Sequence, residues 1–335
     1  MTQVQMFPES VRTAEAEMPR HIIESQQFDV GLLEQIFARA THFQEAFDDK
    51  HDGRVFRSFL DGEAMVLYFW EPSTRTYMSF YRAAQNLGMV VSGTADAENF
   101  SSAVKGETLE DTIRILCGYN PSVIVMRHRT EGAAEIASKV SDVPIVNAGD
   151  GPGQHPTQAL LDMYTIQREI GRLDNISIAL VGDLANGRTV RSLCYLLAKF
   201  ENPYIYFVAP HVVQMKDDIK DYLRRHEVRF EEVGADDLPT VAREVDALYQ
   251  TRIQKERFDE GSDEYEQAKQ ACRKLVISRS VLECMREDAV VMHPLPRLDE
   301  INAEEVDSDP RAAYFRQAHN GMYVRMALLV MLLGR

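Results

Sequence analysis

Cysteine is scarce in this sequence of 335 residues. The four cysteines, Cys117, Cys194, Cys272 and Cys284, lie far apart and include no Cys-x-x-Cys pair. Zinc sites and disulfide frameworks need closely or regularly spaced cysteines, so we predict neither. We also expect no other metal and no cofactor. This cysteine usage is typical of a protein in a reducing cytosol.

Long apolar runs and an apolar leader are also missing. The longest apolar stretch, near residues 326–333, is too short to cross a bilayer. The N-terminal segment carries Glu9, Glu15 and Glu17 and has no apolar core. We therefore expect a loose tail in place of a signal or transit peptide, a cytoplasmic location and no membrane contact.

Basic residues are in the minority, with 37 Lys and Arg against 52 Asp and Glu and a formal net charge of −15. Such a surplus of negative charge disfavours nucleic acid and anionic membranes as partners. A protein of this charge that binds anions must concentrate its basic groups locally. Clusters of Arg, Lys and His beside turns are therefore informative here.

Short apolar runs alternate with segments of helical spacing, which predicts an α/β fold with mostly parallel sheets flanked by helices. The predicted strands are residues 65–70, 89–93, 122–126, 143–147, 176–181, 204–208, 228–233, 246–249 and 289–292. The pattern restarts after the Gly-rich turn near residues 150–155. We expect two domains, 1–155 and 156–312, with a C-terminal helix within 313–335 packing back on the first.

Three regions are harder to assign. Residues 96–106 are polar and are expected to form a loop, and residues 255–274 are strongly charged and are expected to face solvent. In the last segment the apolar pattern predicts a helix over 322–333.

The chemically rich stretches all follow predicted strands, and ligands of open parallel sheets bind at the carboxyl ends of strands. The first is Ser73-Thr74-Arg75-Thr76, at the start of a predicted helix. A helix N-terminus with hydroxyls and a guanidinium is a candidate phosphate site. The alternative is ordinary Ser/Thr capping beside a surface Arg.

Two further clusters follow strands in the first half. Arg127 comes first in Arg127-His128-Arg129, and strand alternation favours it as the side chain that points inward. His155 precedes Pro156, which suits the first helical position, and Gln158 lies one turn along. A capping histidine with a solvated glutamine is the alternative.

In the second half, residues 182–187 contain glycines but not Gly-x-Gly-x-x-Gly, so dinucleotide binding is disfavoured. Arg188 follows this turn. Arg252 and Gln254 follow a buried strand and can project to the same side, or can begin a charged surface helix. His293-Pro294-Leu295-Pro296-Arg297 has two prolines that restrict the backbone, and either X–Pro bond can be cis.

Together these stretches resemble the carbamoyltransferases. Residues 73–76, 155–158 and 293–297 resemble the signatures of this family in order and spacing. Residues 251–254 and Leu295 resemble its aspartate branch. The ornithine branch usually has a cysteine in the His-x-Leu-Pro position, and none is present here. The resemblance extends from about His21 to the C-terminus.

The resemblance implies a role for each matching residue. The expected carbamoyl-phosphate-binding residues are Ser73, Thr74, Arg75, Thr76, Ser101, Lys105, Arg127, His155, Gln158, Pro294 and Leu295. Those expected to bind aspartate are Lys105, Arg188, Arg252 and Gln254. The expected catalytic groups are Arg75, Thr76, Lys105, Arg127, His155 and Gln158.

The implied activity is transfer of the carbamoyl group of carbamoyl phosphate to the amine of L-aspartate, a step of de novo pyrimidine biosynthesis. The resemblance also implies a homotrimer in which Ser101 and Lys105 enter the active site of the neighbouring subunit. Whether separate regulatory chains bind is left open.

The chain departs from the family pattern at two positions. Tyr77 stands where relatives often have a second Arg, and Val104 stands where many have a second Lys. Two other hypotheses are carried forward. One is a carbamoyltransferase that uses a different amine, and the other is a catalytically silent relative that binds anions or acts in assembly.

Overall fold

The structure, a computed structural model, describes residues 17–48, 53–100, 106–254, 258 and 263–334. The chain divides into two compact units, residues 1–161 with 319–335 (unit 1) and residues 162–318 (unit 2). The two divisions fall within helices α7 (Pro156–Ile170) and α14 (Tyr314–Leu332), so each of these helices contributes residues to both units. The predicted N-terminal tail lies largely outside the described residues.

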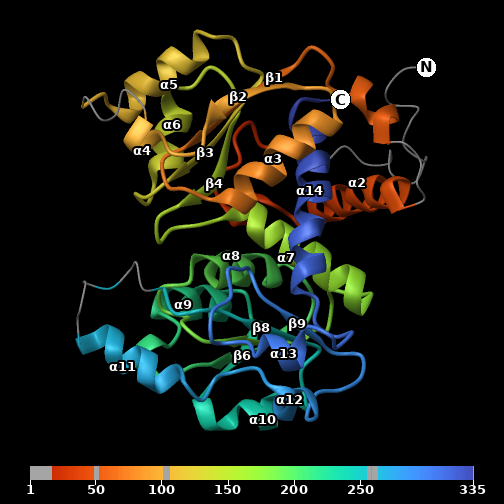
Figure 1. Ribbon diagram of the computed structural model, residues 1–335, viewed down its shortest axis with the longest axis vertical. Helices are drawn as coiled ribbons and strands as arrows, with labels where there is room; N and C mark the ends of the chain where they lie inside the picture. Colours follow the sequence, from red (N-terminus) through yellow and green to blue (C-terminus); the bar gives the residue numbers. More distant parts are fainter. Residues whose placement is uncertain (1–16, 49–52, 101–105, 255–257, 259–262, 335) are drawn as a thin grey trace. The chain divides into compact units, whose positions relative to one another are not determined.

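Unit 1 is built on a four-stranded parallel sheet in the order β2-β1-β3-β4 (Figure 1). The strands are β1 (Ala64–Phe69), β2 (Val90–Thr94), β3 (Val123–His128) and β4 (Ile145–Asp150). Every residue of β4 is buried, and β1 is buried along nearly all of its length. Such continuous apolar runs are characteristic of parallel strands that are covered on both faces.

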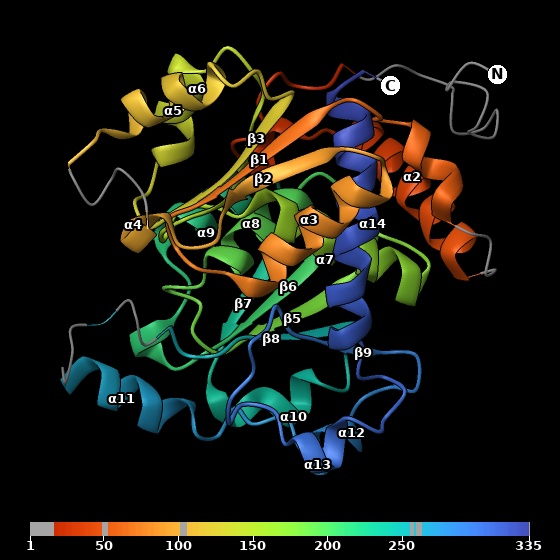
Figure 2. The same cartoon turned by 45° about the horizontal axis from the view of Figure 1, so that its top comes forward.

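Helices cover both faces of this sheet (Figure 2). On one face, α5 (Leu109–Cys117) and α6 (Ala133–Val140) pack against Val66, Ile124 and Met126. The other face carries α3 (Thr74–Asn86), α2 (Val30–Asp48) and the unit 1 part of α14. The shorter elements of unit 1 are the 3₁₀ turns η2 (Ser25–Gln27) and η3 (Gly53–Ser58) and helix α4 (Ala97–Phe100).

The predicted return of the C-terminal helix to the first domain is confirmed. Arg325 of α14 lies over the Phe80 ring, 4.9 Å from its centroid, and donates to Ser79 Oγ over 2.8 Å. Asn320 of the same helix accepts a hydrogen bond of 3.4 Å from Gln44 in α2. These polar contacts tie α14 to two helices of unit 1.

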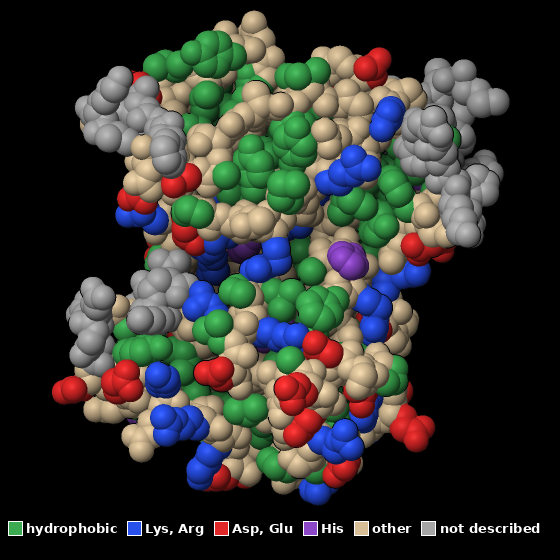
Figure 3. All heavy atoms as spheres, viewed as in Figure 1, with side chains coloured by type: hydrophobic (Ala, Val, Ile, Leu, Met, Phe, Trp, Pro, Cys, Tyr) green, Lys and Arg blue, Asp and Glu red, His purple; other side chains and the backbone are tan. Residues whose placement is uncertain are grey.

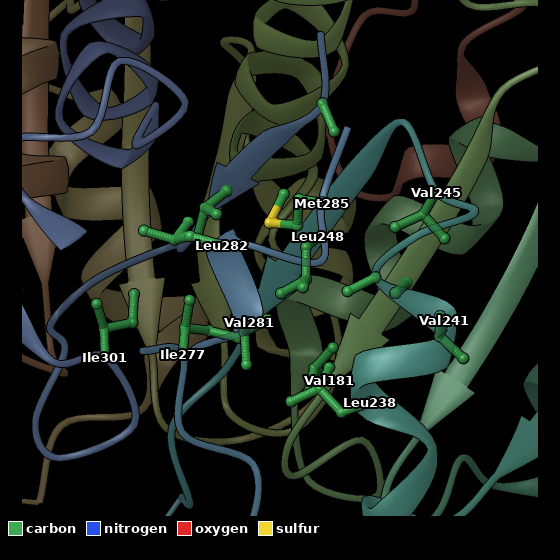
Figure 4. Packing of buried hydrophobic residues seen from close by; sticks show 14 of the residues in the cluster. Val181, Leu238, Val241, Val245, Leu248, Ile277, Val281, Leu282, Met285 and Ile301 are labelled. Carbon is green, nitrogen blue, oxygen red and sulfur yellow. The ribbon is translucent and has the colours of Figure 1, made fainter. Parts of the chain in front are cut away.

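Unit 2 contains a five-stranded parallel sheet in the order β7-β6-β5-β8-β9. Its strands are β5 (Ser177–Val181), β6 (Tyr204–Val208), β7 (Arg229–Val233), β8 (Ala247–Gln250) and β9 (Val290–Met292). Its helical elements are α8 (Arg188–Leu197), α9 (Asp217–Arg225), α10 (Leu238–Val241), α11 (Asp263–Cys272), α12 (Arg279–Leu282), α13 (Ala303–Val306), η5 (His211–Val213) and η6 (Ala235–Asp237). Figure 4 shows the core, in which Val181 and Leu248 of the sheet meet Leu238 of α10 and Leu282 of α12.

The predicted fold class is confirmed, but two segments, residues 97–100 and the start of α14, differ from expectation. Residues 97–100 form the helix α4 where a loop was expected, because the Asp96 carboxylate accepts the Asn99 N–H over 3.3 Å and caps the turn. Residues 263–272 form α11, whose described charged side chains face solvent as expected while Ala268 is buried. Helix α14 begins at Tyr314, before the expected start at 322. The missed turns of α14 contain the buried polar residues Gln317 and Asn320, which broke the apolar pattern.

Among the described residues, no helix has both the length and the apolar character needed to cross a membrane.

Candidate functional site

The turn after β1 presents hydroxyl groups at the start of α3. Ser73 is the N-cap residue, but its side chain makes no capping bond to a backbone N–H. Its hydroxyl instead donates to the Thr76 hydroxyl over 3.1 Å, and Thr76 is buried. The simple capping alternative therefore does not describe Ser73. This N-terminus retains the positive end of the helix dipole, which favours an anion.

Arg127 is the inward-facing basic residue at the end of β3. Its side chain is 11% exposed, whereas that of Arg129 is 54% exposed and pairs with Glu98. The Arg127 guanidinium forms an ion pair with Glu71 and donates to the Ala148 carbonyl over 3.4 Å. Strand register places Arg127 opposite Phe69, so its backbone lies beside the end of β1, where the turn to α3 begins.

His128, between these two arginines, has a different environment. Its Nδ1 accepts the Thr130 N–H over 3.0 Å, and its ring packs edge-on against Trp70 at 4.8 Å. Burial lowers the pKa of His128 below its ordinary value, although nearby carboxylates oppose the shift. The His128 ring is therefore fixed by Trp70 and by the N–H of Thr130.

The turn after β4 leads into α7 through His155, which is 3% exposed. The His155 carbonyl accepts the Gln158 N–H over 2.9 Å and so begins the helix. The Asp150 carboxylate shapes the turn by accepting N–H bonds from Gln154 over 2.7 Å and from Gly132 over 2.9 Å. His155 immediately precedes α7, Gln158 lies on its first turn, and both are buried.

In unit 2 the turn after β5 is organised by the buried Asp183. Its carboxylate accepts the Asn186 N–H over 3.1 Å and the Gln254 N–H over 3.0 Å. Burial raises the pKa of Asp183, while these hydrogen bonds oppose the shift. Asp183 thereby connects the turn that precedes Arg188 to the segment that contains Arg252.

The segment after β8 is tied back to β5 at two points. Thr251 donates from both its N–H, over 2.8 Å, and its hydroxyl, over 3.0 Å, to the Val181 carbonyl. A side chain at Gly182 has no room, since an added Cβ would lie 2.3 Å from the Thr251 carbonyl oxygen. Arg252 Nη1 donates to the Ile253 carbonyl over 2.9 Å.

The segment after β9 holds an unusual backbone. Leu295 has φ +57° and is followed by a cis peptide bond to Pro296. A left-handed conformation costs a residue with a Cβ about 1–2 kcal/mol, so it requires local support. His293 supplies it, because its Nδ1 accepts the Leu295 N–H over 2.7 Å.

This bond also sets the protonation of His293. Since Nδ1 accepts, the ring hydrogen lies on Nε2, which donates to Glu300 over 2.7 Å. Burial alone raises the pKa of Glu300, but the interaction with His293 and the backbone N–H groups of Leu298 and Glu300 together outweigh it, and the pKa lies below its ordinary value.

Each unit therefore brings its own predicted residues together. In unit 1, residues 73–76 follow β1, Arg127 lies near the end of β3 and His155 follows β4, and these three strands are adjacent in the sheet. In unit 2, Arg188, Arg252 and the Pro294–Leu295 pair follow β5, β8 and β9, which are also adjacent. Ser101 and Lys105, together with Val104, lie outside the described residues. Within the described part of the chain, no three His, Cys, Asp or Glu side chains are grouped as metal ligands.

Family models match almost all of the chain. The model of the aspartate/ornithine carbamoyltransferase carbamoyl-P binding domain matches residues 20–168, and that of the Asp/Orn binding domain matches residues 174–332. The chain belongs to the aspartate/ornithine carbamoyltransferase family.

Named relatives within this family are similar over most of their length. The chain is 56% identical over 312 residues to "Aspartate carbamoyltransferase 3, chloroplastic" of Pisum sativum, a match that covers 93% of this chain and 77% of that protein. It is 45% identical to the aspartate carbamoyltransferase catalytic subunit of Clostridium novyi, covering 94% and 98%. Aspartate transcarbamoylase from Trypanosoma cruzi, solved with carbamoyl phosphate and aspartate, matches with 39% identity, a TM-score of 0.84 and coverage of 93% and 96%.

Three residues of this carbamoyltransferase chain were missed by sequence reasoning. They are Glu71, which pairs with Arg127, Asp183, which joins two turns, and Arg325, which donates to Thr157 over 3.4 Å. Glu71 could have been noticed, because it lies only two residues before Ser73. Arg325 could not, since it lies in the apolar stretch that predicted the last helix.

Tyr77, the departure in the family pattern, packs among rings. It meets Phe69 edge-on at 5.3 Å and stacks on Tyr81 at 6.3 Å. Burial raises the pKa of the Tyr77 hydroxyl. Tyr77 thus has an aromatic packing role at this position.

Proposed function

We propose that this chain transfers the carbamoyl group of carbamoyl phosphate to the amine of L-aspartate, giving N-carbamoyl-L-aspartate and phosphate in de novo pyrimidine biosynthesis. The observation that carries the proposal is the carboxyl edge of unit 2. There Arg252 and Gln254 follow β8, and Leu295 follows the neighbouring β9. These residues resemble the aspartate branch of the family.

The residues of unit 1 suit the carbamoyl phosphate half of the reaction. The α3 N-terminus with Ser73 and Arg75 holds the phosphate. Thr76, Arg127 and His155 donate to the carbamoyl carbonyl oxygen, and Gln158 holds the NH₂ group with the carbonyls of Pro294 and Leu295. Donors aimed at an oxygen that gains charge contribute about 3 kcal/mol each to transition-state stabilisation.

The reaction itself needs no covalent nucleophile. The aspartate amine attacks the carbamoyl carbon, a C–N bond forms, and the C–O bond to phosphate breaks. The departing phosphate takes the proton of the amine. Arg188, Arg252 and Gln254, with Lys105, bind the aspartate carboxylates, so much of the rate comes from holding two anions in register.

The proposed assembly is a homotrimer in which Ser101 and Lys105 reach the neighbouring active site. Its support in the described residues is an apolar surface on unit 1, where Val55 is 51%, Met78 54% and Val90 66% exposed. These residues lie on η3, α3 and β2, and Figure 3 shows hydrophobic side chains gathered over α3. Exposed apolar residues on neighbouring elements mark candidate protein interfaces.

A cytoplasmic location also stays a proposal. Its support is the cysteine usage, whereas the Pisum sativum relative is named chloroplastic. Fractionation of the source cells, with the chain followed by antibody, decides between the cytosol and an organelle. Binding of separate regulatory chains is tested by co-purification.

Turnover with different acceptors tests the function. Purified chain with carbamoyl phosphate should release phosphate with L-aspartate and not with L-ornithine. Failure with aspartate and turnover with another amine would establish the alternative carbamoyltransferase. If a folded chain that binds phosphate releases no phosphate from carbamoyl phosphate with any of these amines, the catalytically silent relative is favoured.

A mixing experiment tests the shared active site. Lys105→Ala and Arg127→Ala chains should each be inactive, and should regain partial activity when dissociated and reassembled together. The recovery arises because one mixed site receives an intact Lys105 and an intact Arg127. Absence of recovery, with reassembly verified by sedimentation, contradicts the cross-subunit contribution.

A further inference from the structure

Asp162 of α7 is a fully buried carboxylate at the centre of a hydrogen-bond network in unit 2. Its side chain is 0% exposed. Oδ2 accepts the Tyr249 hydroxyl over 2.8 Å, and Oδ1 accepts the Gln317 Nε2 over 2.7 Å. A buried carboxylate is costly unless hydrogen bonds satisfy it, and both oxygens have such donors here.

Each of the two donors, Tyr249 and Gln317, lies in or contacts a segment that carries residues of the proposed site. Gln317 passes the contact on, because its Oε1 accepts the His293 N–H over 2.8 Å at the start of the strained segment with Leu295. Tyr249 lies in β8, just before Thr251 and Arg252. Its hydroxyl is also hydrogen-bonded to Thr189, the neighbour of Arg188.

The Asp162 carboxylate determines which groups of the network donate hydrogen bonds and which accept them. An ionised carboxylate only accepts, so Gln317 must turn its NH₂ toward Asp162 and its oxygen toward the His293 N–H. For the same reason Tyr249 donates to Asp162, and its oxygen accepts from Thr189. Burial, together with the charge of Asp162, raises the pKa of Tyr249 well above its usual range, which agrees with a hydroxyl that keeps its proton.

We propose that Asp162 is a positioning residue, the common acceptor that holds the segments after β5, β8 and β9 in one arrangement for substrate binding. It touches no substrate itself. Through Thr189, Tyr249 and Gln317 it orients the residues expected to bind the aspartate carboxylates and the carbamoyl amide. The inference rests on the proposed function and adds to it a determinant that lies behind the binding residues.

Asp246 offers a matched control, because it is a second buried carboxylate of unit 2. It is 2% exposed and accepts the Ser177 N–H over 2.7 Å and Arg172 Nη2 over 3.0 Å. These contacts lie at the amino end of β8, opposite the end that carries Thr251. Asp246→Asn should therefore lower stability without altering substrate binding.

Asp162→Asn replaces one acceptor oxygen by an NH₂ donor. If this NH₂ faces Gln317, the Gln317 amide must turn over and oppose two donors at His293. If it faces Tyr249, the hydroxyl hydrogen loses its acceptor and must turn away from position 162. Misplacement of binding groups by about 1 Å costs on the order of 100-fold in rate, and we expect a fall of that size in kcat/KM for aspartate.

Adding Gln317→Glu to Asp162→Asn should restore activity. In the double variant the carboxylate introduced at position 317 accepts from both the amide introduced at position 162 and the His293 N–H, so every bond again has a donor and an acceptor. Gln317→Glu alone places two carboxylates together and should be impaired. Recovery of most of the lost kcat/KM in the double variant is the expected result, because the charge has moved without being lost.

The readouts separate this inference from both a structural role and the proposed function. Kinetic constants, urea unfolding and amide hydrogen exchange of residues 251–254 and 293–297 are measured on each full-length variant. We expect faster exchange in these segments for Asp162→Asn and no change for Asp246→Asn. If the wild-type chain lacks turnover with aspartate, the proposed function fails, and the exchange data alone then decide the role of Asp162.

Two results overturn the inference. One is an Asp162→Asn chain whose kinetics and exchange equal those of Asp246→Asn. The other is a double variant no better than the worse single variant. If Asp162→Asn does not fold, Tyr249→Phe takes its place, since it deletes a single hydroxyl. A rise of about tenfold in KM for aspartate is then expected, and an unchanged KM contradicts the inference.

Discussion

The two units hold the arginines that we propose to face substrate by different means. In unit 1 a carboxylate contacts the guanidinium directly, since Glu71 pairs with Arg127 and the two side chains are 25% and 11% exposed. In unit 2 the carboxylates act from behind. Asp183 is 0% exposed and bonds the N–H of Gln254, two residues beyond Arg252.

The two arrangements predict different consequences when the carboxylate is lost. A carboxylate that touches the arginine sets both its orientation and the local charge that an incoming anion meets. A carboxylate that binds backbone N–H groups sets the shape of the segment. Loss of the anchor should therefore change chemistry in unit 1 and binding geometry in unit 2.

The largest effect should come from the guanidinium that unit 1 anchors. Arg127→Ala removes the cationic group proposed to donate to the carbonyl oxygen, and we expect kcat to fall about 1,000-fold with little change in stability. Steady-state kinetics measure the loss. Arg129→Ala is the control from the same segment, and an equal loss in both variants contradicts the assignment of Arg127.

Asp183→Asn tests the role of the buried carboxylate in unit 2. One oxygen that accepts a backbone N–H becomes a donor, so the segment with Arg252 and Gln254 loses its anchor. We expect KM for aspartate to rise about 30-fold, with binding of carbamoyl phosphate unchanged by calorimetry. Weaker binding of both substrates would indicate general unfolding, and circular dichroism checks this.

Glu71→Gln tests the ion pair that holds Arg127 in unit 1. The guanidinium of Arg127 keeps its charge but loses the ionic partner that orients it. A fall of about tenfold in kcat is expected, with KM for aspartate unchanged. A change confined to KM for aspartate would show that the two anchors do not differ as we describe.

The smallest effect concerns acid stability. Burial raises the pKa of Asp246, but hydrogen bonds from Ser177, Arg172 and Arg286 outweigh it, so the folded-state pKa lies below the unfolded value of about 4. Stability from this carboxylate is present above about pH 4 and is lost as pH falls through the folded pKa.

Asp246→Asn should accordingly be about 2 kcal/mol less stable than the wild type at pH 7. The difference in unfolding free energy should shrink below about pH 4. Urea unfolding at several pH values measures it. A difference that stays constant down to about pH 3 contradicts the depressed pKa.

Much of the fold followed from local pattern. The apolar runs that became β1, β3, β5 and β8 were long enough, and turn residues separated them clearly enough, to be recognised. Segments whose residues are polar but buried were missed. The first turns of α14 are the example, since Gln317 and Asn320 are buried through hydrogen bonds to residues far away in the chain.

The same division applies to the sites. The sequence by itself determined which chemical groups follow the strands, including the hydroxyls and Arg75 at residues 73–76, because strand, turn and helix start are local properties. Only the tertiary structure decided which groups stand behind them. Asp162 meets Tyr249 and Gln317 across 87 and 155 residues of chain. Such buried polar contacts depend on packing and leave no periodic trace in the sequence.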